Sequence, residues 1–266
     1  MPLRKRPSAA ISGGAFRSLQ RTIQFFGGWS SEDGLFTEHL LACARENWEA
    51  AKNHPMTDAI AAGAVPEKVM RKYLIQDHKF LDAFIVLLSS MIAHAPTLED
   101  RIPGAQFLGL ITGKENTYFE RSFAALHVSA EDRSVDPVQV TVEFQKLMRA
   151  AAASGSLARM LAVLIAAEWS YLAWATRVEP TRKEGIPFWC GEWIDLHSGD
   201  SFAGVVSYLR GLLDRAAPSL PELELVQEAR EMCEWEVARG GRQGGCRRQG
   251  TGGSGWHRQG GRRRFK

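Results

Sequence analysis

Residues 73–84 read Tyr-Leu-Ile-Gln-Asp-His-Lys-Phe-Leu-Asp-Ala-Phe, and this stretch decides the fold class. Tyr73, Asp77, Phe80 and Phe84 recur at positions i, i+4, i+7 and i+11, which lie on one face of an α-helix. The carboxylate of Asp77 therefore stands inside an aromatic stripe. Burying a carboxylate costs several kcal/mol unless the group is paired or has a function. The pattern predicts a core helix with an acid on its inner face.

A second helical stretch also carries an acid on an apolar face. Leu161, Leu164, Glu168 and Tyr171 lie at i, i+3, i+7 and i+10 in a segment that is otherwise hydrophobic all round. Two helices therefore each direct one acid toward the interior. Acids that share an apolar site have pKa values that move apart, so that a general acid and a general base can coexist near neutral pH.

A third, weaker pattern lies near the end of the chain. Glu231 and Trp235 share a helical face at i, i+4. Three glutamates fall within six residues here, which also fits a charged surface helix with only one acid pointing inward.

A carboxylate flanked by aromatic rings suits a flat, basic heterocycle. The ring of such a ligand stacks on the aromatic side chains while its amino group donates to the acid. The alternative is a structural role, in which Asp77 is a buried acid bonded to a neighbouring helix end.

Helical periodicity dominates between the two ends of the chain, and no β-hairpin pattern interrupts it. We expect an all-α fold, a single bundle of seven to eight helices joined by short loops. The predicted helices cover residues 35–52, 58–61, 66–93, 105–126, 138–153, 157–179, 184–196, 200–217 and 223–238.

Charge divides the chain into three parts. Residues 1–31 contain five Lys/Arg and no acid, and residues 239–266 contain nine Lys/Arg and no acid. Because the whole chain has a net charge of +3, residues 32–238 carry a net charge of −11. The first segment fits a transit peptide or a disordered start, and the Arg/Gly-rich last segment is expected to be a solvated tail. An RNA-binding tail is the less favoured alternative, because the acidic body would repel nucleic acid.

Several classes of site are not indicated by the sequence. Four cysteines lie without a CxxC pair, and no Glu-x-x-His pairs, GxSxG, Walker loop or GxGxxG after a strand are present. The longest apolar run, residues 160–167, ends at Glu168 and is far shorter than the roughly 20 residues of a membrane span. We therefore expect a soluble protein without a metal site.

Three histidines receive separate predictions. His54 precedes Pro55 and is expected at a helix end, and His78 is expected to be exposed because it lies on a different face from Asp77. His197 either lines a pocket or is a hydrogen-bonded structural residue.

The sequence from about Leu35 to Ala238 resembles the TenA/thiaminase-II family, whose fold is the helical one shared with haem oxygenase. The YLIQD block that ends at Asp77 is the most specific marker. The other markers follow in order along the chain: Trp48 with His54-Pro55, the Gly63 turn, Phe80, AAEWSY around Glu168, EWIDLHSGDSF from Glu192 to Phe202, and the helix with Glu231.

The resemblance implies a role for each candidate residue. Asp77 matches the acid that holds the pyrimidine ring nitrogen and amino group, and Phe80 matches its stacking neighbour. Phe144 and Tyr171 match two pocket tyrosines, of which Tyr171 orients the chemistry. Glu231 matches the late catalytic glutamate. His197 falls near another pocket position, and Tyr73 shares the helical face of Asp77.

One departure from the family pattern indicates a branch. Ala167 stands where most relatives carry a nucleophilic cysteine, and the neighbouring Glu168 is typical of the cysteine-lacking branch called TenA_E. Without a thiolate, water is the expected nucleophile unless a carboxylate attacks directly. The hypothesis assigns the base and acid roles to Glu168 and Glu231, with Tyr171 holding the relay and no cofactor or metal required.

A second departure lies at the end of the last matched helix. Relatives continue this helix, whereas Gly240 and Gly241 stop it here, which would weaken the wall that carries Glu231.

The resemblance implies a hydrolase of thiamine salvage. It would remove the amino or formylamino group from 4-amino-5-aminomethyl-2-methylpyrimidine to give the hydroxymethyl pyrimidine. The alternative is a non-catalytic pyrimidine-binding or regulatory protein on the same scaffold. The resemblance also implies a homo-oligomer, a dimer or a tetramer, without a membrane or nucleic-acid partner. The expected location is cytoplasmic, or plastid or mitochondrial if residues 1–31 act as a transit peptide.

Overall fold

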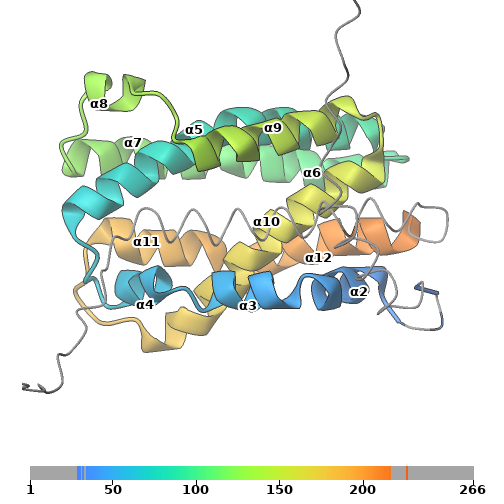
Figure 1. Cartoon of the computed structure of the whole chain (residues 1–266), viewed down its shortest axis with the longest axis horizontal. Helices are drawn as coiled ribbons and strands as arrows, with labels where there is room; N and C mark the ends of the chain where they lie inside the picture. The colour runs from blue at the N-terminus through green and yellow to red at the C-terminus, as the bar shows by residue number, and fades with distance from the viewer. Residues whose placement is uncertain (1–28, 31, 33, 217–225, 227–266) are drawn as a thin grey trace, which may run out of the picture.

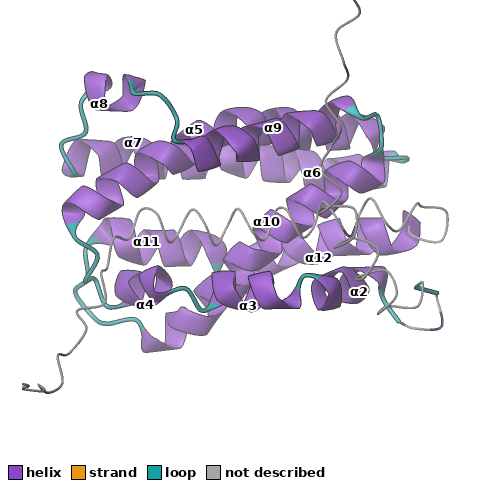
Figure 2. Cartoon of the chain, in the orientation of Figure 1, coloured by secondary structure: helices purple, strands orange, loops and turns teal. Residues whose placement is uncertain are grey.

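The computed structural model describes residues 29, 30, 32, 34–216 and 226, and within them it contains helices and no strands (Figures 1 and 2). This confirms the predicted all-α class. The elements are α2 (Phe36–Cys43), α3 (Arg45–Lys52), α4 (Pro55–Ala61), α5 (Glu67–His94), α6 (Leu98–Leu110), the π-helical turn η2 (Ile111–Glu115), α7 (Asn116–Ala125), α8 (Ala130–Ser134), α9 (Gln139–Ala153), α10 (Leu157–Val178), the 3-10 turn η3 (Glu179–Thr181), α11 (Phe188–His197) and α12 (Gly199–Ala216).

Two layers of helices enclose one central helix. In Figure 1, α5, α6, α7 and α9 form the upper layer, α2, α3, α4, α11 and α12 form the lower layer, and α10 crosses between them. Helix α10 packs against α5 and α9 above and against α3, α11 and α12 below. Most side chains of α10 therefore meet one layer or the other, and few of them reach solvent.

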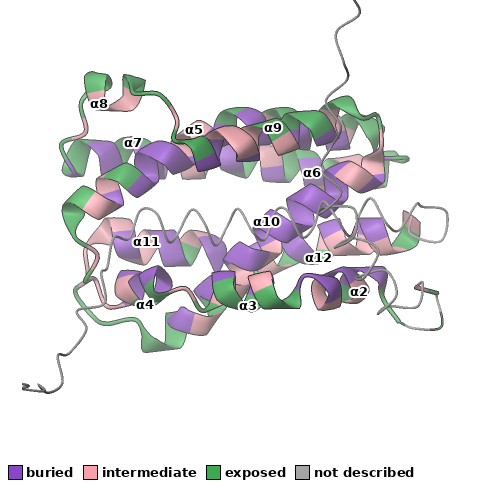
Figure 3. Ribbon diagram, viewed as in Figure 1, coloured by how far each residue is buried: buried purple, intermediate pink, exposed green. Residues whose placement is uncertain are grey.

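Burial follows from this central position. Fifteen of the 22 residues of α10 are buried, and the long helix α5 buries its inner face, as the purple bands in Figure 3 show. By length and composition alone, the helical residues 157–181 could cross a membrane, so this segment is more apolar than the short run of residues 160–167 suggested. However, 72% of its most apolar 18-residue stretch is buried inside the fold, as in the core helix of a bundle.

Local chemistry explains where the helices begin. His54 caps α4, because its Nδ1 accepts a hydrogen bond from the Met56 amide and Pro55 takes the first helical position. The helix-end prediction for His54 is thus confirmed. Gly63 ends the next turn with a φ of +62°, and a Cβ there would lie 2.8 Å from Ile186 Cγ2. Only glycine lets this turn approach the loop before α11 so closely.

Four predicted boundaries are wrong for local reasons. The predicted helix 35–52 is two helices, because the chain turns at Ala44 (φ −101°, ψ 7°). The predicted loop 129–137 contains α8, which begins with a capping box between Ser129 and Asp132. The helix predicted from residue 184 begins at Phe188, since Pro187 holds an extended conformation before it.

The fourth error concerns the segment predicted as one helix over residues 105–126. It begins at Leu98, where the Thr97 hydroxyl accepts from the Asp100 amide, and it includes Pro103. A π-helical turn at residues 111–115 then divides it into α6 and α7. The extra residue of a π turn rotates the side chains that follow it, and such turns are frequent at functional sites.

Candidate functional site

The predicted acid Asp77 is joined to α10 by a buried hydrogen bond. Helix α5 presents Asp77 and helix α10 presents Tyr171, and the side chains are 2% and 4% exposed. The Tyr171 hydroxyl donates to Asp77 Oδ1 over 3.0 Å, and the Tyr73 hydroxyl lies 3.5 Å from that of Tyr171. Two phenols from different helices therefore form a short polar chain to one carboxylate, which stabilises its charge in a place that water hardly reaches.

Aromatic rings from α5 and α9 form a second part of the site. Phe80 stacks on Phe144, with ring centroids 4.9 Å apart and planes inclined by 27°, and Phe84 lies 5.2 Å from Phe80. Phe80 stands three residues after Asp77, on the same side of α5. The predicted association of an acid with aromatic faces is thus present. These rings offer flat surface for a planar ligand.

His197 is buried and lies beside Tyr171. Its ring lies 4.5 Å from the Tyr171 ring, inclined by 30°, so it borders the polar chain. Its Nδ1 lies 2.9 Å from the Trp193 carbonyl oxygen. A carbonyl only accepts hydrogen bonds, so Nδ1 carries a proton and this contact holds the ring in place.

Glu168 is buried in the middle of α10, at 5% exposure. It precedes Tyr171 by three residues, which places both side chains on the same side of the helix. The preceding residue, Ala167, is completely buried and offers no nucleophile.

The two described cysteines lie in other helices, Cys43 in α2 and Cys190 in α11. Burial raises the pKa of the Cys190 thiol to about 11, so this group stays a thiol at neutral pH and is a poor nucleophile. Neither described cysteine lies in α10, and Cys43 Sγ lies 3.6 Å from His39 Nε2.

Seven of the eight predicted site residues are described, and all seven are buried. Direct contacts join Tyr73, Asp77, Tyr171 and His197, and a separate stack joins Phe80 to Phe144. The eighth residue, Glu231, lies outside the described residues, as does its neighbour Trp235. Its role stays a prediction.

Two aromatic residues that the sequence did not single out complete the site. Trp193 is fully buried, and its ring lies 6.1 Å from Tyr73, 6.0 Å from Tyr171 and 4.3 Å from His197. Among the described residues its Nε1 has no hydrogen-bond partner. Tyr118 stacks on Trp193 at 5.1 Å and donates its hydroxyl to the Trp189 carbonyl. Its pKa is raised well above the usual value, mainly by burial, so Tyr118 stays neutral.

A further acid, Glu115, was also missed. Burial, and secondly the negative charge of Asp77, raise the pKa of Glu115 to about 8. Its spacing could have revealed it, because Glu115 precedes Tyr118 by three residues and Phe119 by four. This is the same pattern of an acid among aromatic residues that identified Asp77. Glu115 is the last residue of the π turn η2.

The prediction that His78 is exposed is wrong. His78 is half-buried, and its ring packs 5.2 Å from Phe119 and 5.4 Å from Phe123, while its Nε2 lies 3.4 Å from Asn116 Oδ1. The physical reason is the neighbouring helix α7, which covers the side of α5 that the sequence alone leaves open.

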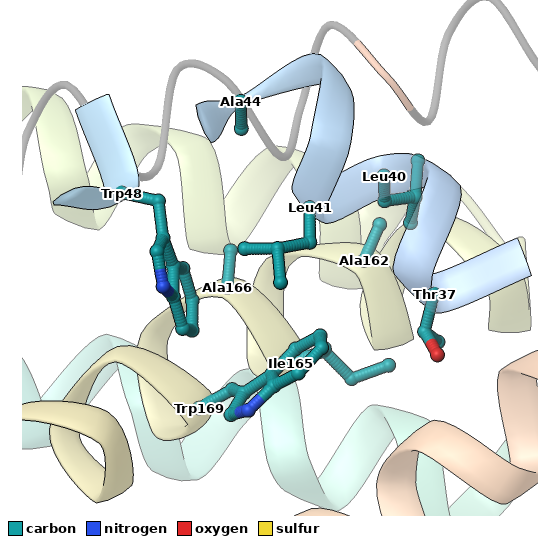
Figure 4. A pocket seen from close by; sticks show the side chains of 9 residues that line it. All are labelled: Thr37, Leu40, Leu41, Ala44, Trp48, Ala162, Ile165, Ala166 and Trp169. Atoms are coloured by element: carbon teal, nitrogen blue, oxygen red, sulfur yellow. The ribbon is translucent and has the colours of Figure 1, made fainter. Parts of the chain in front are cut away.

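An apolar pocket lies on another side of α10, away from the acids. It measures about 290 Å³, including space open to solvent, and α2, α3 and α10 enclose it (Figure 4). In Figure 4, Trp48 and Trp169 flank one end and Thr37 marks the other, where it supplies the single polar side chain. With so few polar groups, this pocket offers no acid–base chemistry.

Among the described residues, no group of three or more His, Cys, Asp or Glu side chains lies where it could hold a metal ion.

Within the helical bundle, the buried acid Asp77 is thus bonded to Tyr171, and Phe80 on the same side of α5 stacks on Phe144. The family model described as TENA/THI-4/PQQC matches residues 41–237. The chain belongs to this family.

Two curated relatives are similar to most of this chain. The chain is 26% identical to an aminopyrimidine aminohydrolase of Halalkalibacterium halodurans over 190 residues, which cover 71% of this chain and 85% of the relative. It is also 26% identical to the aminopyrimidine aminohydrolase of Bacillus subtilis over 202 residues, covering 70% and 79% of the two chains.

Solved structures of the family show the same fold. A TenA homologue from Pyrococcus furiosus superimposes with a TM-score of 0.70 at 20% identity, covering 77% of this chain and 98% of that one. A protein from Silicibacter titled a TenA family transcription regulator has a TM-score of 0.70 at 22% identity, covering 78% and 95%. At such identities the likeness establishes the helical fold, which is the haem-oxygenase-like one expected from the sequence.

Proposed function

We propose that this protein is an aminopyrimidine aminohydrolase of thiamine salvage. The reaction replaces the amino group on the 5-methylene carbon of 4-amino-5-aminomethyl-2-methylpyrimidine, or the formylamino group of its N-formyl derivative, by a hydroxyl group. The observation that carries the proposal is the buried Asp77 carboxylate, which accepts a hydrogen bond from Tyr171 over 3.0 Å and has the buried Phe80 on the same side of α5. The curated relatives, named aminopyrimidine aminohydrolases, support the same reaction.

Asp77 is the group that recognises the ligand in this proposal. Its carboxylate accepts from the exocyclic amino group at position 4 and from an adjacent ring nitrogen when that nitrogen carries a proton. Tyr171 occupies one side of Oδ1, which orients the carboxylate toward the ligand. Phe80 and Phe144 supply the stacking surface beside it.

Water is the nucleophile in the proposed reaction, because Ala167 takes the place of a cysteine. One of Glu168 and Glu231 removes a proton from water as the new C–O bond forms. The other protonates the nitrogen as the C–N bond breaks, so that ammonia or formamide leaves. Glu168 is suited to this work by burial beside Tyr171. With Ala167 in place of a cysteine and Glu168 beside it, we propose that the protein belongs to the cysteine-lacking TenA_E branch.

The decisive experiment is the Glu168→Gln substitution. We expect turnover of the aminomethyl pyrimidine to fall by about 10²- to 10⁴-fold, the usual contribution of a general acid or base, while the affinity for the ligand stays within a few fold. Product formation is followed by mass spectrometry. The matched control is Glu179→Gln, an exposed acid directly after the same helix, which should leave turnover unchanged. Unchanged turnover in Glu168→Gln would remove Glu168 from the mechanism.

A non-catalytic role is the second candidate, and the Silicibacter relative titled a transcription regulator favours it. Both candidates require Asp77 for ligand binding, and only the enzyme releases ammonia or formamide. Tight binding of the pyrimidine without any product after prolonged incubation would decide for a binding protein.

A further inference from the structure

The hydrogen-bond chain at Asp77 has a fixed direction. The Tyr171 hydroxyl donates to Asp77 Oδ1 over 3.0 Å, and the Tyr73 hydroxyl lies 3.5 Å from the Tyr171 hydroxyl. An ionised carboxylate only accepts hydrogen bonds, so the single proton of the Tyr171 hydroxyl points toward Asp77. Toward Tyr73, the Tyr171 oxygen can then only accept. Tyr73 is therefore the donor of this second bond and the first member of the chain.

All three members of the chain are buried. Tyr73, Tyr171 and Asp77 are 7%, 4% and 2% exposed. In such surroundings consecutive hydrogen bonds polarise one another, and a hydroxyl that accepts one bond donates more strongly in the next. The bond from Tyr73 thus strengthens the bond from Tyr171 to Asp77. The proposed mechanism uses Tyr171 and Asp77 and gives no part to Tyr73.

The indole ring of Trp193 on α11 contacts both phenol rings of the chain. It meets Tyr73 and Tyr171 edge to face, with ring centroids 6.1 and 6.0 Å away and planes inclined by 79° and 86°. Trp193 also stacks on Tyr118 at 5.1 Å, and both of these rings are fully buried. Closely packed rings keep single rotamers. One ring of α11 thus fixes two phenols that come from α5 and α10, and with them the place where their hydroxyls meet.

We propose that Tyr73 is a positioning residue of the Asp77 site, whose hydroxyl donates to Tyr171 and so holds the Tyr171 proton on Asp77. It orients the carboxylate through Tyr171 and does not touch the ligand. This inference rests on the proposed function and deepens it, because a carboxylate in a fixed orientation binds the amino group of an aminopyrimidine more strongly than one that is free to turn. The alternative is that the Tyr73 hydroxyl contacts the ligand itself.

A double-mutant cycle separates these two roles. It compares the unaltered full-length protein with Tyr73→Phe, Tyr171→Phe and the variant that carries both substitutions. Phenylalanine keeps each ring and its contact with Trp193 and removes only the hydroxyl. Affinity is measured by calorimetry at pH 7. The probe is 4-amino-5-hydroxymethyl-2-methylpyrimidine, the product of the proposed reaction, so that no turnover disturbs the binding equilibrium.

The expected losses follow from the kind of hydrogen bond that is removed. Tyr171→Phe should bind about 10- to 100-fold more weakly, because a bond to a charged group is lost. Tyr73→Phe should bind about 3- to 10-fold more weakly, because its bond joins two neutral groups. Adding Tyr73→Phe to Tyr171→Phe should cost less than about 2-fold, since the chain through which Tyr73 acts is already broken. A Tyr73 hydroxyl that contacts the ligand would cost the same factor in both backgrounds.

Kinetics distinguish positioning from a general loss of structure. A residue that orients the binding carboxylate should raise KM and leave kcat nearly unchanged when its hydroxyl is removed. A smaller folded fraction would instead lower kcat at constant KM. The matched control is Tyr208→Phe, which removes a hydroxyl that donates to the Asp100 carbonyl over 2.6 Å, between α12 and α6. This variant should bind the probe with unaltered affinity.

Two results would overturn the proposal. One is an equal loss of affinity from Tyr73→Phe in the unaltered protein and in Tyr171→Phe, and the other is a folded Tyr73→Phe variant with unaltered affinity and KM. Both leave the proposed function standing, because the unaltered protein still binds the pyrimidine. If the unaltered protein does not bind it, the proposed function fails and this inference fails with it.

Discussion

Two faces of helix α10 differ sharply although their residues are neighbours in the sequence. Glu168 and Tyr171 are buried acid-site residues, and Tyr171 donates to Asp77 of α5. Ala162, Ile165, Ala166 and Trp169 line the apolar pocket beneath α2 and α3. Glu168 and Trp169 are consecutive in the sequence, yet their side chains point in directions about 100° apart around the helix. One face of α10 is therefore polar where it meets α5, and the other is apolar where it meets α2 and α3.

The two faces of α10 have different roles, one in stability and the other in the candidate site. On the apolar face, Trp48 packs edge-on against Trp169 at 5.1 Å, and Arg210 lies 3.8 Å above the same ring. These contacts bury surface and need no exact hydrogen-bond geometry. On the acid face, hydrogen bonds between polar groups must offset the free-energy cost of burying them, so the geometry of these groups tolerates little change. Substitutions on the two faces should therefore affect different measurements.

The largest effect is expected on stability, from Trp48→Ala on the apolar side. Removing a ring that is 6% exposed should lower the free energy of unfolding by about 3–5 kcal/mol, because it leaves a cavity against Trp169. Denaturant unfolding measures this loss. Affinity for the pyrimidine, measured on the folded fraction, should stay unchanged. Leu98→Ala, at a residue 65% exposed, is the control and should change stability by no more than about 0.5 kcal/mol. A large loss of affinity in folded Trp48→Ala would break the contrast between the faces.

The next effect concerns Asp77→Asn, across from the acid face of α10. Ligand affinity should fall by about 2–5 kcal/mol, because a buried charge-assisted contact is lost. Stability should change less than in Trp48→Ala, since the amide keeps the shape and can still accept from Tyr171. Calorimetry and thermal unfolding on the same samples test both statements. Asp82→Asn is the matched control, an exposed acid of the same helix paired with Arg149 at the surface. Full affinity in Asp77→Asn would contradict the assignment of Asp77.

The smallest of these effects is expected from Tyr171→Phe. Loss of a hydroxyl that donates to a carboxylate should reduce ligand affinity or turnover by about 1.5–3 kcal/mol and leave the aromatic contacts with His197 intact. Steady-state kinetics separate the two consequences. A fall in kcat alone indicates that the hydroxyl acts in the transition state, and a rise in KM alone indicates that it only orients Asp77. Wild-type kinetics would mean that the hydrogen bond is structural.

Much of the site could be predicted from periodicity. Tyr73, Asp77 and Phe80 share a helical face in the sequence and all are buried in the structure, as is Glu168 on the second helix. The spacing was informative because a long helix repeats every 3.6 residues whatever its surroundings. The same rule applied to Glu115 and Tyr118 would have identified the further acid.

Sequence alone determined the helical class, the acids that must turn inward and the lack of a cysteine at Ala167, because these depend on residue type and helical spacing. Only the tertiary structure decided that Tyr171 reaches Asp77 across 94 residues, that Trp193 and Tyr118 close the site, and that His78 is covered by α7. The physical reason is that partners for a buried group come from other helices. Their packing angles and the break at residues 111–115 depend on how all the side chains fit together.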